Sequence, residues 1–66
     1  MVGVTYTKEM QEEATLAMAR FVVRDLRAGQ QEVTLARVTR IVFVASPAGT
    51  TQASVRRAAK QAVLES

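Results

Sequence analysis

The segment VTLARVTRIVFVAS, residues 33–46, decides the fold class of this 66-residue chain. Its apolar residues recur at the three- and four-residue spacing of a helix that packs against a core. They are Leu35, Val38, Ile41, Val42 and Ala45. Half of the segment is nevertheless β-branched, and the run Ile41–Val44 is equally typical of a buried strand. We expect a helix, and a strand remains the alternative because periodicity does not separate the two in a short apolar run.

The chain after this segment predicts a turn followed by a second amphipathic helix. Pro47 ends the preceding element, Gly49 allows a turn, and Thr50 or Thr51 can cap a helix that runs to about Leu64. The inward face of that helix carries Val55, Ala58, Ala59, Ala62 and Val63. The outward face carries Gln52, Arg56 and Lys60, four residues apart and flanked by Ser54 and Arg57.

The chain before the segment predicts an extended arm and a long helix. Residues 2–7 alternate apolar and small or polar side chains, as a short strand or arm does. Thr7 is a suitable N-cap, and the helix is expected to end near Ala28, before Gly29. Its core-facing stripe is expected to comprise Met10, Ala14, Ala17, Met18, Phe21, Val22 and Leu26.

A homodimer is expected from the apolar surface of this long helix. Residues 16–23 are apolar nearly all round, which indicates that the helix is covered on more than one side. A chain of this size builds only a small core, and it has no Cys for a disulfide. We therefore expect a second copy to pack on the first helix and the N-terminal arm.

Charge and composition narrow the classes of function. The chain has no Cys and no His, so thiol nucleophiles, zinc fingers and imidazole-dependent triads are excluded. The net charge is +3, with −1 in residues 1–32 and +4 in residues 33–66. This asymmetry favours a polyanionic partner for the C-terminal half. We expect no enzyme activity, no cofactor and no metal.

The last helix has the side chains that a DNA-reading helix needs. Glutamine can bond adenine at two atoms, arginine can bond guanine or phosphate, and the N–H groups at a helix start can bind phosphate. The predicted DNA-binding residues are Thr50, Thr51, Gln52, Ser54, Arg56, Arg57 and Lys60, with Arg37 and Arg40 as phosphate contacts.

Residues 45–58, ASPAGTTQASVRRA, resemble the helix-turn-helix motif of phage repressors and Cro-like proteins. The resemblance is carried by Ala45, Gly49 and Val55, and extends over about residues 41–60. Residues 53–58, ASVRRA, also look like recognition helices of winged-helix regulators. The resemblance implies that the alanine lets two helices cross closely, the glycine makes the turn and the valine locks the second helix onto the first. It also implies that residues 50–57 face the major groove of DNA.

The sequence thus predicts a single, mainly α-helical domain over residues 1–66, a helix-turn-helix unit with a short extended arm. We expect a cytoplasmic, homodimeric protein that binds double-stranded DNA, does not enter the membrane and acts as a transcriptional repressor or accessory factor. The alternative is an α+β interaction or assembly module of order βαββα. In that arrangement the loop at residues 46–51 would follow a strand, where anions often bind, although its single Gly and lack of Lys exclude a P-loop.

Overall fold

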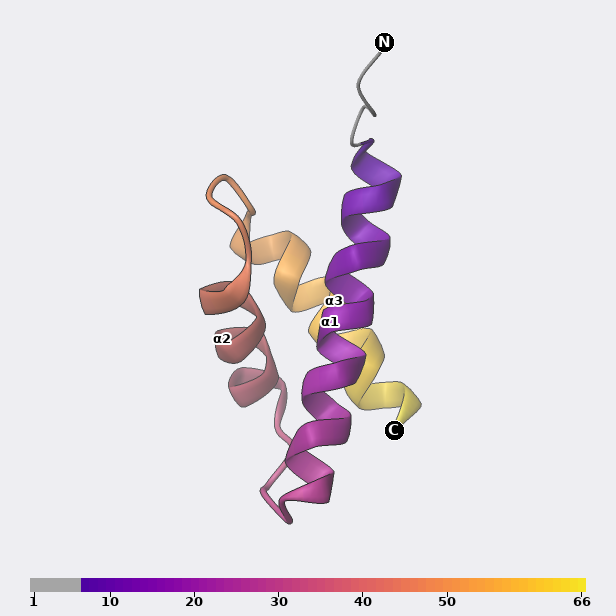
Figure 1. The fold of residues 1–66 in the computed structure, drawn as a ribbon, viewed down its shortest axis with the longest axis vertical. Helices are drawn as coiled ribbons and strands as arrows, with labels where there is room; N and C mark the ends of the chain where they lie inside the picture. The colour runs from indigo at the N-terminus through magenta and orange to yellow at the C-terminus, as the bar shows by residue number, and fades with distance from the viewer. Residues whose placement is uncertain (1–6) are drawn as a thin grey trace, which may run out of the picture.

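Three helices make up the fold in the computed structural model, which describes residues 7–66 (Figure 1). They are α1 (Lys8–Ala28), α2 (Leu35–Ala45) and α3 (Gln52–Glu65), and residues 7–66 contain no strand. The prediction of a mainly α-helical domain is confirmed, and the α+β alternative is wrong. The predicted arm at residues 2–7 lies outside the described residues, except for Thr7.

Packing explains why residues 33–46 form a helix in spite of their β-branched side chains. Val38 and Val42, one helical turn apart, are both fully buried. Burial of a valine side chain contributes about 1.5–3 kcal/mol, whereas the helix propensity of a β-branched residue costs less than about 0.7 kcal/mol. Residues 7–66 contain no strand with which this segment could pair, whereas α1 and α3 both pack against its apolar face as a helix, so the helix is the more stable conformation.

Each helix begins at a threonine whose hydroxyl satisfies a free backbone N–H group. Thr7, Thr34 and Thr51 accept hydrogen bonds from the backbone N–H groups of Met10, Arg37 and Ser54, at 3.1, 3.2 and 3.2 Å. The turn between α2 and α3 contains Gly49 with a φ of 93°, a conformation that glycine adopts without strain. The predicted caps at Thr7 and Thr51 and the predicted end of the first helix at Ala28 are confirmed.

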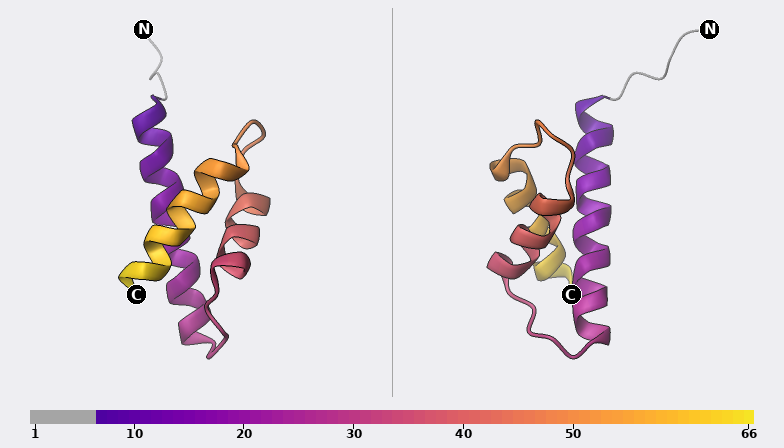
Figure 2. Two further views of the ribbon diagram at one scale, coloured as in Figure 1. Left: turned by 180° about the vertical axis from the view of Figure 1, so that it is seen from behind. Right: turned by 60° about the vertical axis from the view of Figure 1, so that its left-hand side comes forward.

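The core lies between α1 on one side and the pair α2 and α3 on the other (Figure 2). Its buried apolar residues within 7–66 are all alanine or valine, with partly buried leucines packed around them: Ala19, Val22, Val23, Val38, Val42, Val55, Ala58, Ala59 and Ala62. Small side chains let helix backbones approach closely, so three short helices enclose a core with few large residues. The expected inward face of α3 is confirmed, with Val63 only half-buried.

The predicted core-facing stripe of α1 is wrong for four of its residues. Met10, Ala14, Ala17 and Phe21 are exposed, and Phe21 has 67% of its surface accessible. The buried residues of α1 are Thr15, Ala19, Val22 and Val23. The error has a physical origin: α1 is apolar on two opposite faces, and periodicity does not say which of them this chain covers itself.

None of the helices within residues 7–66 combines the length and the apolarity that crossing a membrane requires.

Candidate nucleic-acid interface

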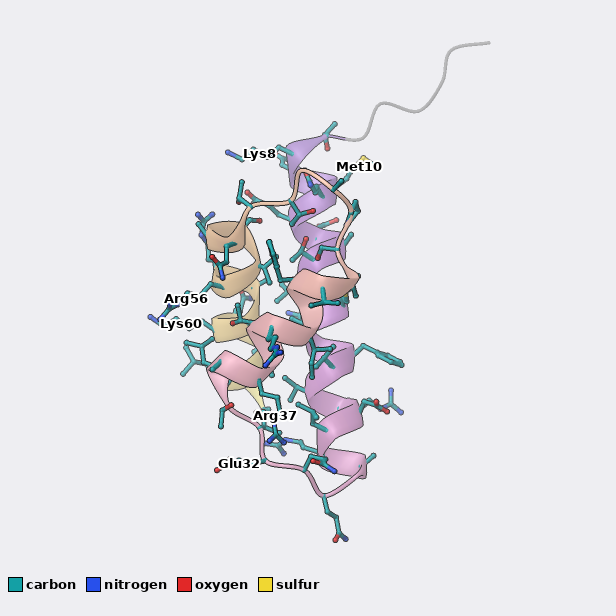
Figure 3. The ribbon with its side chains drawn as sticks, turned by 90° about the vertical axis from the view of Figure 1, so that its left-hand side faces the viewer. Lys8, Met10, Glu32, Arg37, Arg56 and Lys60 are labelled. Carbon is teal, nitrogen blue, oxygen red and sulfur yellow. The ribbon has the colours of Figure 1, made fainter. Side chains whose placement is uncertain are left out.

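Arg40, Gln52 and Arg56 line a groove between α2 and α3, which we call the α2/α3 groove. Its other lining residues are Leu35, Ala36, Thr39, Phe43 and Val44. Lys60 lies one turn beyond Arg56 on α3, and both side chains point away from α1 (Figure 3). The structure therefore brings together four of the nine predicted DNA-binding residues: Arg40, Gln52, Arg56 and Lys60. We refer to these four as the cationic flank.

The cationic flank has no compensating negative charge. No carboxylate lines the α2/α3 groove. All four side chains are exposed, and none of Arg40, Arg56 and Lys60 makes an ion pair or side-chain hydrogen bond with another residue of 7–66. Unpaired charges of one sign on one surface produce a positive potential that attracts a polyanion.

Apolar side chains complete the groove, although the sequence did not mark them as part of the site. Phe43 is 40% and Val44 78% exposed. The strand alternative implied that the whole run Ile41–Val44 is buried. The helical stripe left Phe43 and Val44 off the core face, which is the signal that could have marked them as surface residues. Apolar contacts of this kind can pack against a sugar or a thymine methyl group.

Arg57 is separated from the cationic flank although it follows Arg56 in the chain. It lines a different groove, between α1 and α3, together with Glu9, Glu12 and Glu13. These carboxylates offset its charge, because they belong to the same concave surface. Adjacent residues of a helix lie about 100° apart, which places Arg56 on the α2 side of α3 and Arg57 on the α1 side.

Three of the predicted DNA-binding residues build the turn and the start of α3. The Thr51 hydroxyl is the N-cap, and Ser54 donates its backbone N–H to it. Thr50 is half-buried, its N–H donates to the carbonyl of Pro47 at 3.2 Å, and its hydroxyl oxygen is enclosed. Of these three side chains only that of Thr51 makes a hydrogen bond that caps α3, whereas Gln52 is exposed in the first turn of the helix.

Arg37 is directed to the connection between α1 and α2 and away from the α2/α3 groove. Its guanidinium donates to the side-chain oxygen of Gln31 and to the backbone carbonyl of Glu32, both at 3.3 Å. It is exposed and lies near Glu32 (Figure 3). Of the two arginines predicted on α2, only Arg40 extends the cationic flank.

One ion pair occurs within residues 7–66, away from the cationic flank, and the sequence did not predict it. Arg20 of α1 and Glu65 of α3 form an ion pair with an N–O distance of 2.8 Å. Hydrogen bonds from Arg20 and from Gln61 lower the pKa of Glu65 to about 2. Glu65, at the end of α3, is the only acidic side chain among residues 33–66, and it is bound to Arg20 in this pair.

The three residues that carry the helix-turn-helix resemblance differ in their burial and their place in the fold. Val55 is fully buried and Gly49 forms the turn, as that resemblance implies. Ala45 is exposed at the last position of α2, so the two helices do not cross at this residue. No protein-family model, no curated protein and no solved structure matches the chain.

Proposed function

We propose that this protein binds double-stranded DNA through the cationic flank of α3 and α2. It acts as a homodimeric transcriptional repressor or accessory factor in the cytoplasm. The observation that supports the proposal is the exposed row of Gln52, Arg56 and Lys60, which Arg40 extends across a groove without a carboxylate.

The chemistry of this flank suits a duplex. Arginine and lysine provide charge for the phosphates, which supply most of the affinity of DNA-binding proteins. Gln52 lies at the exposed start of the helix, where an amide can bond an adenine edge while Arg56 bonds guanine or phosphate. The alanines on the opposite side of α3 pack tightly against the other helices and hold the helix rigidly in place.

The experiment is a titration of random-sequence duplex, followed by fluorescence anisotropy at two salt concentrations. We expect the Arg56→Ala/Lys60→Ala variant to bind at least about tenfold more weakly and to lower the slope of log K against log salt by about two, since two phosphate contacts are lost. The helical circular dichroism of the variant should be unchanged because both residues are exposed.

The matched control is Lys8→Ala/Arg57→Ala, which removes the same charge from residues that share a hollow with Glu12. This control should bind duplex within about threefold of the unaltered protein, because its cations are already offset by carboxylates. Equal losses in the two variants would contradict the proposal. Binding of polyglutamate as tight as that of duplex at the same salt concentration would also contradict the proposal, because it would show that the surface binds any polyanion.

A further inference from the structure

The outer face of α1 is an unpartnered apolar surface opposite the core. It consists of Met10, Ala14, Ala17 and Phe21, all exposed and spaced by four, three and four residues. That is the spacing with which two helices pack along a common seam. We propose that a second copy of this chain packs antiparallel on this outer face of α1.

The apolar side chains are large at the ends of the face and small in the middle. Met10 is 42% and Phe21 67% exposed, whereas Ala14 and Ala17 lie between them. In an antiparallel pair Met10 meets Phe21 of the partner subunit, and Ala14 meets Ala17 of the partner subunit. The alanines then allow the two helices to approach closely while the large residues fill the space on either side.

Charges along one edge of the outer face select the partner. The edge on the α3 side carries Glu9 and Glu13 in the first half of α1, which line the groove between α1 and α3. The same edge carries Arg24 and Arg27 in the second half, beside Arg20, whose guanidinium is already paired with Glu65 of its own chain. One helix therefore presents an acidic half and a basic half on the same side of its apolar seam.

Only an antiparallel arrangement makes this edge complementary to itself. A two-fold axis perpendicular to α1 sets the edge against the same edge of the partner, with the acidic half facing the basic half. A parallel pair would set it against the opposite edge, where Gln11, Met18 and Asp25 lie, so that only Asp25 would meet an opposite charge and Glu9 and Glu13 would meet none. Opposite charges across a seam determine partner and orientation, so a second copy is the occupant that this surface fits.

This inference rests on the homodimer in the proposed function and specifies its interface. The inference does not depend on DNA binding, and none of its tests uses DNA. A failure of the dimer tests therefore leaves the duplex titration to be judged by itself, and a failure to bind duplex does not affect the dimer.

The first test compares two exposed apolar residues by sedimentation equilibrium over a range of protein concentrations. We expect a monomer–dimer equilibrium whose dissociation constant rises at least about tenfold in Phe21→Asp. The control Leu64→Asp changes a residue that is 75% exposed on α3 and should leave the constant unchanged. A chain that stays monomeric at all concentrations, or equal effects of the two variants, would overturn the proposal.

The second test reverses the charges at one end or at both. Glu9→Lys/Glu13→Lys should weaken the dimer about tenfold or more, because lysines would then face the partner's arginines. Adding Arg24→Glu/Arg27→Glu to the same chain should restore it. The control Glu12→Lys alters a carboxylate of the same groove that lies about 100° around α1 from Glu13, further from the outer face and toward the turn before α3, and it should have little effect. Failure of the combined variant to recover, while its helical content is intact, counts against the antiparallel arrangement.

The third test measures orientation directly, and the lack of cysteine in the chain allows a single label. A spin label at Ala28→Cys, at the exposed end of α1, reports the distance between equivalent ends of the two helices. With the seam centred between Ala14 and Ala17, an antiparallel pair places the labels about 35–40 Å apart at 1.5 Å per residue. A distance near the helix spacing of about 10 Å would show a parallel pair and overturn the inference.

Discussion

The guanidinium of Arg20 donates from Nε and Nη2 to the two carboxylate oxygens of Glu65, both at 2.8 Å. The two residues are 45 positions apart, and the contact joins the middle of α1 to the last turn of α3. Gln61 donates to the same carboxylate at 3.2 Å. Glu65 is therefore held from two sides although it lies on the surface.

This pair predicts a loss of stability in acid. The pKa of Glu65 is about 2 in the fold and has its ordinary value of 4.5 when the chain is unfolded. Between these values the unfolded chain takes up a proton that the folded chain does not, so stability is full above pH 4.5 and falls as the pH decreases toward 2. Urea denaturation at pH 6 and at pH 3 measures the difference.

Glu65→Gln is the variant that isolates the effect, because it removes the titrating group. Its urea midpoint should change less between pH 6 and pH 3 than that of the unaltered chain. Glu32→Gln serves as a control, since only the backbone carbonyl of Glu32 is engaged. A pH dependence in Glu65→Gln as large as in Glu32→Gln would contradict the assignment of the acid-induced loss of stability to Glu65.

A second prediction concerns the end of α1. Gln30 has a φ of 55°, in the left-handed region that non-glycine residues adopt at a cost, whereas Gly29 next to it has a φ of −85°. Gln30→Gly should therefore raise the free energy of unfolding by about 0.5–1 kcal/mol, the relief of strain exceeding the added entropy of the unfolded chain. Gln31→Gly should lower it. Chemical denaturation of both variants measures these free energies of unfolding. A Gln30→Gly variant less stable than the unaltered chain would contradict the prediction.

A third prediction follows from the alanine side of α3. Ala59 is a fully buried core residue of α3, and Ala53 on the same helix is exposed. Ala59→Leu should destabilise the fold by about 1–3 kcal/mol or more, because there is no space for a larger side chain. Ala53→Leu should be close to neutral. Thermal unfolding followed by circular dichroism measures both, and equal stability of the two would show that the core is loosely packed.

Local patterns were sufficient to predict the elements of this fold but not the way their faces are used. Threonine caps, Gly29, Pro47 and apolar spacing place the three helices correctly because these signals act within a few residues. The core face of α1 required knowledge of where α2 and α3 pack. The apolar face with Phe21 and the face with Val23 both satisfy the helical period, and tertiary contact alone distinguishes them.

In the candidate site, too, the sequence did not show on which surface a given side chain lies. The sequence groups Arg56 and Arg57 as neighbours, yet Arg56 lines the groove between α2 and α3 and Arg57 the groove between α1 and α3. It also groups Arg37 with Arg40, although Arg37 bonds the connection between α1 and α2. All four residues of the cationic flank lie in the half of the chain that has the excess positive charge, but the division of that charge into separate surfaces depends on helix packing.

The last prediction combines the two proposals. Arg56 and Lys60 point to one side of the molecule, and Met10, on the outer face of α1, points to the other (Figure 3). A dimer that forms through the outer face therefore carries its two cationic flanks at opposite ends. Such a dimer is suited to hold two duplex segments, one at each end, and not two adjacent half-sites of one duplex.

We expect beads that carry one duplex to retain a second, fluorescent duplex when the protein is added at low salt. Phe21→Asp should still bind a single duplex by anisotropy but should retain little of the second, because its monomers have one cationic flank. Leu64→Asp should retain both duplexes as the unaltered chain does. If the dimer of the unaltered chain binds duplex but does not retain the second one, the two flanks share one duplex, and the arrangement with flanks at opposite ends is wrong.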